Sequence, residues 1–438
     1  MPPARARPAM RTWRTLLRRA VRSRPGRAAA RSGDARDDRF AGYRTLSGPT
    51  LIDVPQVAHD PKRDADPRLV VLMPHLDAAK MTGGPNTVMH VAARAAAAGL
   101  PLRFVATMGP LAPDPAAVLA QIHTVTGIAL DHSARFDDVS AKGSTLGVGA
   151  GDVLLATWWP TAHLAQAALR YVRAQGFLYL VQDYEPAFYA WSTRSALADA
   201  TYRMPIRPIV NEPLLERYLR GVHAGVFADP GHPTITFMPA VDRAVFARHR
   251  RPAGDARRLV FYARPGKPRN LFEIGLRVLR RAAAEGLFDV EPWELIAVGQ
   301  DLPELALSEH HVLRPRPWSA YPAYGELLGS SDVLLSLMLS PHTSYPPLEM
   351  AAAGGLVVTN TFGPKTREAV AAISPSIRAA DPDVDSLLGT LREAVGEVRA
   401  GRPDGVDASG VSVPATWDEA LRDVVPWITA QVSELRAG

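Results

Sequence analysis

A regular alternation of short apolar runs with longer helix-like segments constrains this chain more than any other feature. Runs such as LVVLM (69–73), FLYLVQD (177–183) and RLVFYAR (258–264) have the length and residue types of buried strands. Segments such as TAHLAQAALRYVRAQG (161–176) and NLFEIGLRVLRRAAAEG (270–286) predict helices that end at a glycine. Strands separated by helices form parallel βαβ units, so we expect an α/β fold.

The alternation occurs twice, which predicts two Rossmann-like parallel-sheet domains. The second series begins after FMPAVDRAVF (237–246). The predicted divisions are an Arg-rich tail at 1–45, an N-terminal domain at 46–238, a C-terminal domain at 239–414 and a helix at 415–438 that could cross back onto either domain. Ligands of open parallel sheets bind beyond the carboxyl ends of the strands. Two such domains facing each other would form a ligand-binding cleft.

The composition of the chain excludes several kinds of site and of segment. The chain has no cysteine, which excludes disulfides and thiolate metal sites and agrees with a reducing compartment. No apolar run approaches the roughly 20 residues of a membrane-spanning helix. The tail lacks the apolar core of a secretory signal, so we expect a cytoplasmic protein.

The positive charge of the chain lies in its first 40 residues. This segment holds twelve arginines and three aspartates, whereas the whole chain carries a net charge of +6, so the remainder is slightly acidic. The segment is typical either of a solvated arm or of a short basic amphipathic helix that lies on the inner face of an anionic plasma membrane. Nucleic acid is not an expected partner, because no aromatic-interleaved basic surface continues beyond this segment.

A basic loop follows the predicted strand at 258–264. Arg264, Lys267 and Arg269 occur in ARPGKPRN, which leads into a helix. Guanidinium groups match phosphate oxygens, and a helix N-terminus adds a positive partial charge. The loop therefore predicts a diphosphate site, with a solvated basic loop as the alternative.

Two loops of the first series are weaker candidates. Gly83 and Gly84, in TGGPNT, could bring backbone amides close to a ligand, although a plain tight turn explains them equally well. Asp183 and Glu185, in VQDYEPAFYAW, combine carboxylates with aromatic rings, as suits a polyhydroxylated ligand. As catalytic candidates they would orient such a ligand or act on its hydroxyl proton. The alternative there is a hydrophobic anchor with two surface acids. His75, in MPHLD, is a catalytic candidate that could equally be structural.

An isolated carboxylate marks the stretch SPHTSYPPLEMAAAGG. Glu349 follows Pro346 and Pro347, which fix the backbone at the start of a short helix. A carboxylate in the first turn is stabilised by the helix dipole. A stiff backbone is also what a ligand-holding carboxylate needs.

These stretches resemble one family. PPLEMAAAGGLVVTN is similar to the nucleotide-binding signature of the retaining GT-B glycosyltransferases, and YARPGKPRN is similar to their phosphate-gripping loop. PAVDRAVF resembles their interdomain segment. Together with VQDYEPAFY and LSLMLSPHTSYPPLEMAA, they resemble the WsaF-type rhamnosyltransferases of bacterial surface glycans. One departure is that the first of two glutamates in the broader signature falls on Pro341, next to His342.

The resemblance implies a function and a set of site residues. Glu349 would hold the nucleotide ribose, and Ser344 and Tyr345 would also belong to the donor site with the basic loop. The donor would be a nucleotide-sugar, dTDP-rhamnose, and the acceptor a glycan or lipid-linked saccharide bound by the N-terminal domain. No cofactor or metal is expected, because basic side chains and helix ends offset the diphosphate charge. The alternatives are a nucleotide-sugar epimerase of the same fold and a non-catalytic glycan-binding protein.

Overall fold

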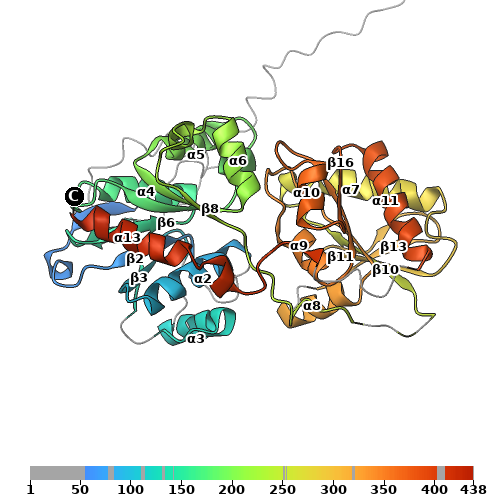
Figure 1. Ribbon diagram of the computed structural model, residues 1–438, viewed down its shortest axis with the longest axis horizontal. Helices are drawn as coiled ribbons and strands as arrows, with labels where there is room; N and C mark the ends of the chain where they lie inside the picture. Colours follow the sequence, from blue (N-terminus) through green and yellow to red (C-terminus); the bar gives the residue numbers. More distant parts are fainter. Residues whose placement is uncertain are drawn as a thin grey trace, which may run out of the picture. The chain divides into compact units, whose positions relative to one another are not determined.

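The computed structural model describes residues 55–76, 83–109, 114–130, 134–141, 143–249, 252, 254–317, 321–401 and 410–437. These residues belong to one compact unit, Asp53–Gly438, in which two seven-stranded sheets each organise a domain (Figure 1). The Arg-rich segment 1–40 lies outside the described residues, so its membrane role stays a prediction.

The N-terminal domain is built on an entirely parallel sheet. Its strands, in spatial order, are β4 (Arg135–Asp138), β3 (Leu102–Ala106), β2 (Leu69–Met73), β6 (Val153–Ala156), β7 (Phe177–Val181), β8 (Ile206–Asn211) and β9 (Ile235–Phe237). Its helices are α2 (Gly84–Ala97), α3 (Pro115–Thr126), α4 (Trp159–Ala168), α5 (Thr193–Ala200) and α6 (Pro213–Gly221). β1 (Gln56–His59) and β5 (Thr145–Val148) form a separate two-stranded parallel sheet.

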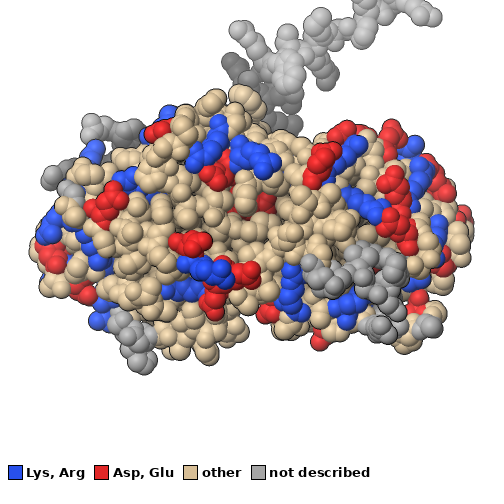
Figure 2. Space-filling view, viewed as in Figure 1, with Lys and Arg blue, Asp and Glu red and all other residues tan. Residues whose placement is uncertain are grey.

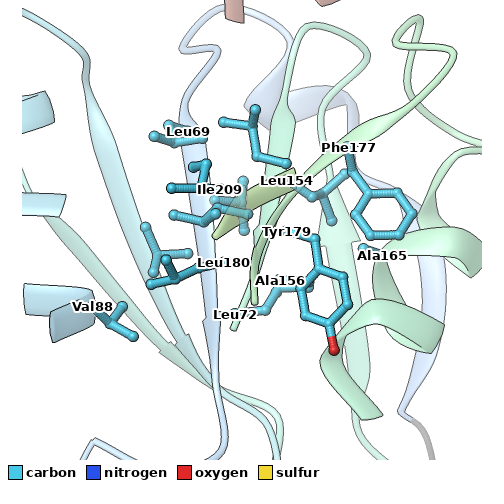
Figure 3. Packing of buried hydrophobic residues seen from close by; sticks show 14 of the residues in the cluster. Leu69, Leu72, Val88, Leu154, Ala156, Ala165, Phe177, Tyr179, Leu180 and Ile209 are labelled. Atoms are coloured by element: carbon cyan, nitrogen blue, oxygen red, sulfur yellow. The ribbon is translucent and has the colours of Figure 1, made fainter. Parts of the chain in front are cut away.

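Apolar residues fill most positions of the inner strands of this sheet, with the buried Arg103 of β3 as an exception. β2, β3, β6 and β7 are buried throughout, as expected for strands covered on both faces. Figure 3 shows Leu72, Leu154, Phe177 and Leu180 of this core packed together. The strand predicted at 69–73 is confirmed at the same residues.

The C-terminal domain repeats the architecture. Its strands, in spatial order, are β12 (Leu305–Ala306), β13 (Val312–Pro315), β11 (Trp293–Val298), β10 (Arg257–Tyr262), β14 (Val333–Leu335), β15 (Leu356–Asn360) and β16 (Ile377–Ala380); only β12 runs antiparallel to its neighbour. Its helices are α7 (Phe272–Ala284), α8 (Tyr321–Gly329), α9 (Tyr345–Ala352), α10 (Arg367–Ile373) and α11 (Val384–Arg399). Leu259 and Phe261 of β10 enter one apolar cluster and Val260 enters another, so both faces of this sheet are covered.

The strand order locates a topological switch point in the C-terminal sheet. From the central strand β10 the chain first moves outward through β11 to β13, and then returns to β14 on the other side of β10. The carboxyl ends of β10 and β14 are therefore neighbours. Ligands of open α/β sheets bind at such a point.

The C-terminal segment crosses back to the N-terminal domain. It consists of α12 (Trp417–Ala420) and α13 (Val424–Ala437) rather than one continuous helix. Leu421, Ile428 and Val432 lie in the N-terminal core, and α13 packs beside α2, as Figure 1 shows in red. The helix expected at 161–176 is also shorter than predicted. It ends at Ala168, because the chain then turns so that the Arg173 N–H bonds to the Ala150 carbonyl at 2.8 Å.

Charged side chains are intermixed on the surface. On the face shown in Figure 2, Lys and Arg alternate with Asp and Glu, and no large area carries a single sign. No helix in the described ranges is both long enough and apolar enough to span a bilayer.

Candidate functional site

The three predicted cations lie together at the end of β10. A turn closes when the Lys267 N–H bonds to the Arg264 carbonyl at 2.9 Å, and a 3₁₀ helix, η8 (Pro268–Asn270), then leads into α7. The exposed Lys267 has a lowered pKa through partial burial and the nearby charges of Arg264 and Arg269. The structure therefore brings the three side chains into one positive cluster beside the start of α7.

Arg264 is held by its own domain. Its Nη1 donates to the Tyr262 hydroxyl at 3.4 Å, and its guanidinium carbon lies 5.8 Å from the centre of the Tyr262 ring. Burial raises the pKa of Tyr262; Arg264 opposes this rise and the nearby charge of Glu349 adds to it. Tyr262 is thus influenced both by the basic loop and by the α9 carboxyl group, so both belong to one region.

Glu349 is buried in α9 at 6% exposure. Burial raises the pKa of its carboxyl group to about 8, and the nearby Tyr324 hydroxyl offsets only part of this rise. Pro346 and Pro347 stand in the first turn of α9, as the sequence suggests. An apolar environment therefore surrounds a carboxyl group that changes charge near neutral pH.

Ser344 and Tyr345 begin α9, but Tyr345 faces the N-terminal domain. Its hydroxyl lies 2.5 Å from the Thr87 Oγ1 and accepts a hydrogen bond from the Asn211 Nδ2 at 3.2 Å. Ser344 caps the helix with a positive φ of 75°, which is unusual for a residue other than glycine. The hydroxyl of Tyr345 is therefore committed to the contact between domains, and its predicted role in donor binding stays a prediction.

Asp183 is an ionised carboxylate at the contact between the two domains. Its Oδ1 accepts from the Tyr184 N–H at 2.8 Å and from the Ser340 hydroxyl at 2.5 Å. Its Oδ2 lies 3.4 Å from both the Arg269 Nε and the His342 Nε2. Burial alone would raise the pKa of Asp183, but His342, Arg269 and Ser340 favour the charged form more strongly and lower it to about 2.

Both ring nitrogens of His342 lie beside protein groups. The Ser344 N–H donates to its Nδ1 at 3.0 Å, so Nδ1 carries no proton. The other ring nitrogen, Nε2, faces Asp183. Both ring nitrogens are therefore occupied by protein groups, and His342 positions Asp183 rather than serving as a free base.

The loop between β14 and α9 makes these contacts, and buried polar side chains hold its backbone in place. β14 ends at Leu335; the chain then leaves the sheet, and Met338 bonds to side chains instead. Asn360 pairs with both backbone groups of Met338, and the fully buried Lys365 donates to its carbonyl at 2.8 Å. Burial lowers the pKa of Lys365 to about 8, against the opposing effects of Glu212 and Asp183.

Glu212 makes a second contact between the domains at this loop. It is 2% exposed, and its Oε1 accepts from the Thr343 N–H at 2.8 Å and lies 3.2 Å from the Thr343 hydroxyl. Burial raises the pKa of Glu212, and Thr343 offsets part of the rise. Glu212, Lys365 and Asn360 were not predicted from the sequence. For Glu212 and Asn360 the available signal was a polar residue directly after, or at the end of, an apolar strand, and Lys365 had no such signal.

Glu185 is buried and hydrogen-bonded to groups of its own domain. Its Oε2 accepts from the Trp159 N–H at 2.6 Å and from the Tyr179 hydroxyl at 2.9 Å. Burial raises the pKa of Glu185 to about 8 despite these two donors. The carboxyl group is 3% exposed, so the alternative of a surface acid is wrong, and the catalytic role of Glu185 stays a prediction.

His75, Gly83 and Gly84 follow β2 in the N-terminal domain. His75 is half-buried beside Gly109, where an added Cβ would lie 3.1 Å from the His75 Cβ. Gly83 has a φ of 56° and begins α2, and Gly84 lies against the side chain of Gln182. Most of the TGGPNT stretch therefore lies in the first turn of α2, and the catalytic and donor-binding roles of these residues stay predictions.

The described residues contain no group of three or more His, Cys, Asp or Glu side chains placed to hold a metal ion. The charges of the site come from arginine, lysine and isolated carboxylates. These groups suit an anionic, hydroxyl-bearing ligand.

Two family models match this chain in order. The model "WsaF, N-terminal domain" matches residues 68–211, and the model "WsaF, C-terminal domain" matches residues 257–392. The O-antigen biosynthesis protein RfbC of Myxococcus xanthus is 36% identical over 251 residues, which are 57% of this chain and 18% of RfbC. The chain thus spans less than a fifth of the length of this relative.

Two solved structures share the fold. Sucrose-phosphate synthase from Thermosynechococcus elongatus superimposes with a TM-score of 0.54 at 14% identity, covering 84% of this chain and 97% of that one. WaaG, a glycosyltransferase involved in lipopolysaccharide biosynthesis, gives a TM-score of 0.50 at 14% identity, covering 84% and 100%. At such identities the likeness concerns the fold alone. That fold is the GT-B arrangement of two Rossmann-like domains, as predicted.

Proposed function

Because this chain belongs to the WsaF family, whose two domain models match it in order, we propose that it is a glycosyltransferase of surface-polysaccharide assembly. It transfers a sugar from a nucleotide-sugar to a glycan or lipid-linked acceptor. The narrower proposal, which comes from the sequence resemblance, is transfer of rhamnose from dTDP-rhamnose. The name of the relative RfbC, an O-antigen biosynthesis protein, supports the polysaccharide setting.

The observation that carries this proposal is the convergence of cations and a buried carboxyl group at the switch point of the C-terminal sheet. Arg264, Lys267 and Arg269 follow β10, and the charges of Arg264, Arg269 and Glu349 all act on Tyr262 at the end of that strand. The cations bind the diphosphate, and the Glu349 carboxyl group bonds to the ribose hydroxyls. Each charge-assisted hydrogen bond contributes about 1.5–3 kcal/mol.

The reaction exchanges one bond to the sugar carbon for another. The bond between the anomeric carbon and the diphosphate oxygen breaks, and the acceptor oxygen bonds to that carbon and loses its proton. The leaving nucleoside diphosphate carries the negative charge that develops. Arg264 and Arg269 stabilise that charge as it forms, which lowers the barrier. By family analogy, the anomeric configuration is retained.

The N-terminal domain supplies the acceptor side in this proposal. Asp183 has a pKa of about 2 and is a weak base at neutral pH, so its contribution is to position neighbouring groups. Glu185 is buried and accepts hydrogen bonds from the Trp159 N–H and the Tyr179 hydroxyl. His75 and the turn at Gly83 remain the candidates of this domain for contact with the substrates.

Assay of the purified chain with a panel of nucleotide-sugars and saccharide acceptors tests the function. We expect transfer from dTDP-rhamnose that is unaffected by EDTA. Arg264→Ala and Glu349→Ala should weaken donor binding about 10- to 100-fold. Arg280→Ala, which alters an arginine further along α7, is the control.

Three outcomes would contradict the proposal. Unchanged donor affinity in both site variants would show that the site is wrongly assigned. Conversion of the donor to an epimer without acceptor would identify an epimerase. A chain that binds a glycan but no nucleotide-sugar would be a glycan-binding protein.

We also propose that residues 1–40 attach the chain to the cytoplasmic face of an anionic membrane. The support is the charge of this segment, in which twelve arginines face three aspartates. Co-sedimentation with vesicles that contain phosphatidylglycerol should require these residues. Equal pelleting of the full chain and of a chain lacking them would contradict this role.

A further inference from the structure

Arg269 is a residue of the C-terminal domain whose side chain is held by the N-terminal domain. Its guanidinium carbon lies 4.0 Å from the centre of the Phe188 ring, which belongs to the 3₁₀ helix η5 (Glu185–Phe188). Its Nε lies 3.4 Å from the Asp183 Oδ2. One face and one edge of the guanidinium group are therefore covered by residues from the other domain.

The backbone of Arg269, in contrast, is fixed within its own domain. The Leu339 N–H bonds to the Arg269 carbonyl at 2.7 Å, and the Asn270 Nδ2 donates to the Leu337 carbonyl at 3.2 Å. These contacts locate the Cα atom but leave the long side chain free to turn. Its direction is set by Phe188 and Asp183.

The remaining donors of Arg269 are those that suit a phosphate. Asp183 occupies the Nε edge and Phe188 occupies one face, so the terminal Nη1 and Nη2 groups are the ones available to a ligand. The side chain is 25% exposed, so these groups can be reached. Arg264 differs, because its support, Tyr262, comes from its own domain.

On the basis of the proposed function, we propose that Phe188 and Asp183 are positioning residues that orient Arg269 toward the donor diphosphate. The diphosphate site is then complete only when the N-terminal domain holds this arginine. The N-terminal domain thereby controls the affinity of the C-terminal domain for the nucleotide. By reciprocity, a bound nucleoside diphosphate stabilises the contacts of Arg269 with Phe188 and Asp183.

Phe188 is the better probe of the two residues. Replacing Asp183 would disturb Arg269 but would also remove a negative charge near the phosphate, and these two effects have opposite signs. Phe188 is uncharged, so its loss acts on Arg269 only through the stacking contact. A cation–π contact of this kind corresponds to about a 3- to 10-fold effect on affinity.

Calorimetric titration of the full chain with dTDP tests the proposal. We expect Phe188→Leu to weaken dTDP binding about 3- to 10-fold, and Phe188→Tyr, which keeps an aromatic face, to retain the affinity of the unaltered chain. In an Arg269→Ala background, Phe188→Leu should have no further effect, because its influence passes through the arginine. Phe136→Leu, the same change at a partly buried ring on β4, is the matched control.

The outcomes separate this inference from the proposed function. If the unaltered chain binds dTDP and Phe188→Leu binds it equally well, the positioning role is overturned and the proposed function stands. Additive losses from Phe188→Leu and Arg269→Ala would also overturn it. If the unaltered chain binds no nucleoside diphosphate, both the proposed function and this inference are overturned.

Discussion

Two buried acids in different regions of this protein have opposite protonation behaviour. At the contact between the domains, Asp183 is 5% exposed and has a pKa of about 2. In α9, Glu349 is 6% exposed and has a pKa of about 8. The exposures are nearly equal, so burial alone does not decide the charge of a carboxyl group. Charged and hydrogen-bonding partners do.

Glu185 supports the same conclusion from within the loop of Asp183. It lies two residues away and accepts two hydrogen bonds, yet its pKa is about 8. Its donors are a backbone amide and a tyrosine hydroxyl, which are neutral. Asp183 has His342 and Arg269 beside it in addition to its neutral donors. The protein therefore keeps Asp183 charged, whereas burial raises the pKa of Glu185, of Glu349 and of Glu212, which also lies at the domain contact.

The largest expected effect comes from removing the charge at the domain contact. Asp183→Asn leaves Arg269 without its counter-charge, and we expect the free energy of unfolding at pH 7 to fall by about 3 kcal/mol. Glu349→Gln should not lower it, because the neutral amide resembles the protonated carboxyl group and, unlike Glu349, needs no proton uptake on folding at pH 7. Denaturant unfolding followed by tryptophan fluorescence measures both values.

Asp418→Asn is the control for this prediction. Asp418 pairs with Arg94 at 2.7 Å but is 82% exposed, so its loss should cost less than about 1 kcal/mol. If Asp183→Asn and Glu349→Gln destabilised the protein equally, the contrast between the two regions would be incorrect.

A change of pH should alter the free energy of unfolding by a smaller amount. The pKa of Glu349 is about 8 in the folded protein and near 4.5 in the unfolded chain, so its contribution to stability is complete below pH 4.5 and is lost as the pH rises through 8. Between pH 6 and pH 8 this loss amounts to about 2 kcal/mol. Asp183 acts in the opposite sense: its contribution is complete above its unfolded pKa of 3.8 and is lost as the pH falls through 2.

Glu349→Gln should therefore flatten the fall in stability between pH 6 and pH 8. Glu185→Gln should flatten it further, because Glu185 has the same shift. Unfolding free energies at several pH values give both slopes. A Glu349→Gln variant with the slope of the unaltered chain would refute the raised pKa.

The smallest effect is expected at the link between the two regions. Tyr345 joins α9 to the N-terminal domain through Thr87 and Asn211. Tyr345→Phe removes these hydrogen bonds and keeps the ring, so the free energy of unfolding should fall by about 1 kcal/mol. Denaturant unfolding beside Tyr171→Phe, which alters a more exposed ring, measures it. Equal stability of Tyr345→Phe and the unaltered chain would mean that this link contributes nothing.

The fold was predictable where strands are apolar throughout. Buried parallel strands such as β2 need apolar residues on both faces, so their sequences are distinctive. β8 was missed because Pro208 interrupts it. That proline lies where the neighbouring β9 no longer pairs, so the missing N–H costs no hydrogen bond on that side. The break between α12 and α13 was missed because both halves carry helix-forming residues.

The site was predictable only in part. The cations after β10 and the carboxylate of α9 follow strands in the sequence, and the order of the strands brings them together. The contact of Asp183 with Ser340 joins residues 157 positions apart and has no local signal. The difference between Asp183 and Glu185 was equally hidden, because both lie in one short polar loop and only their tertiary partners distinguish them.

A crystal structure of the full chain with dTDP tests the central claim most directly. We predict that the diphosphate lies within hydrogen-bond distance of the Arg264 and Arg269 guanidinium groups, with the ribose hydroxyls on the Glu349 carboxyl group. A nucleotide bound away from these three side chains would contradict the account.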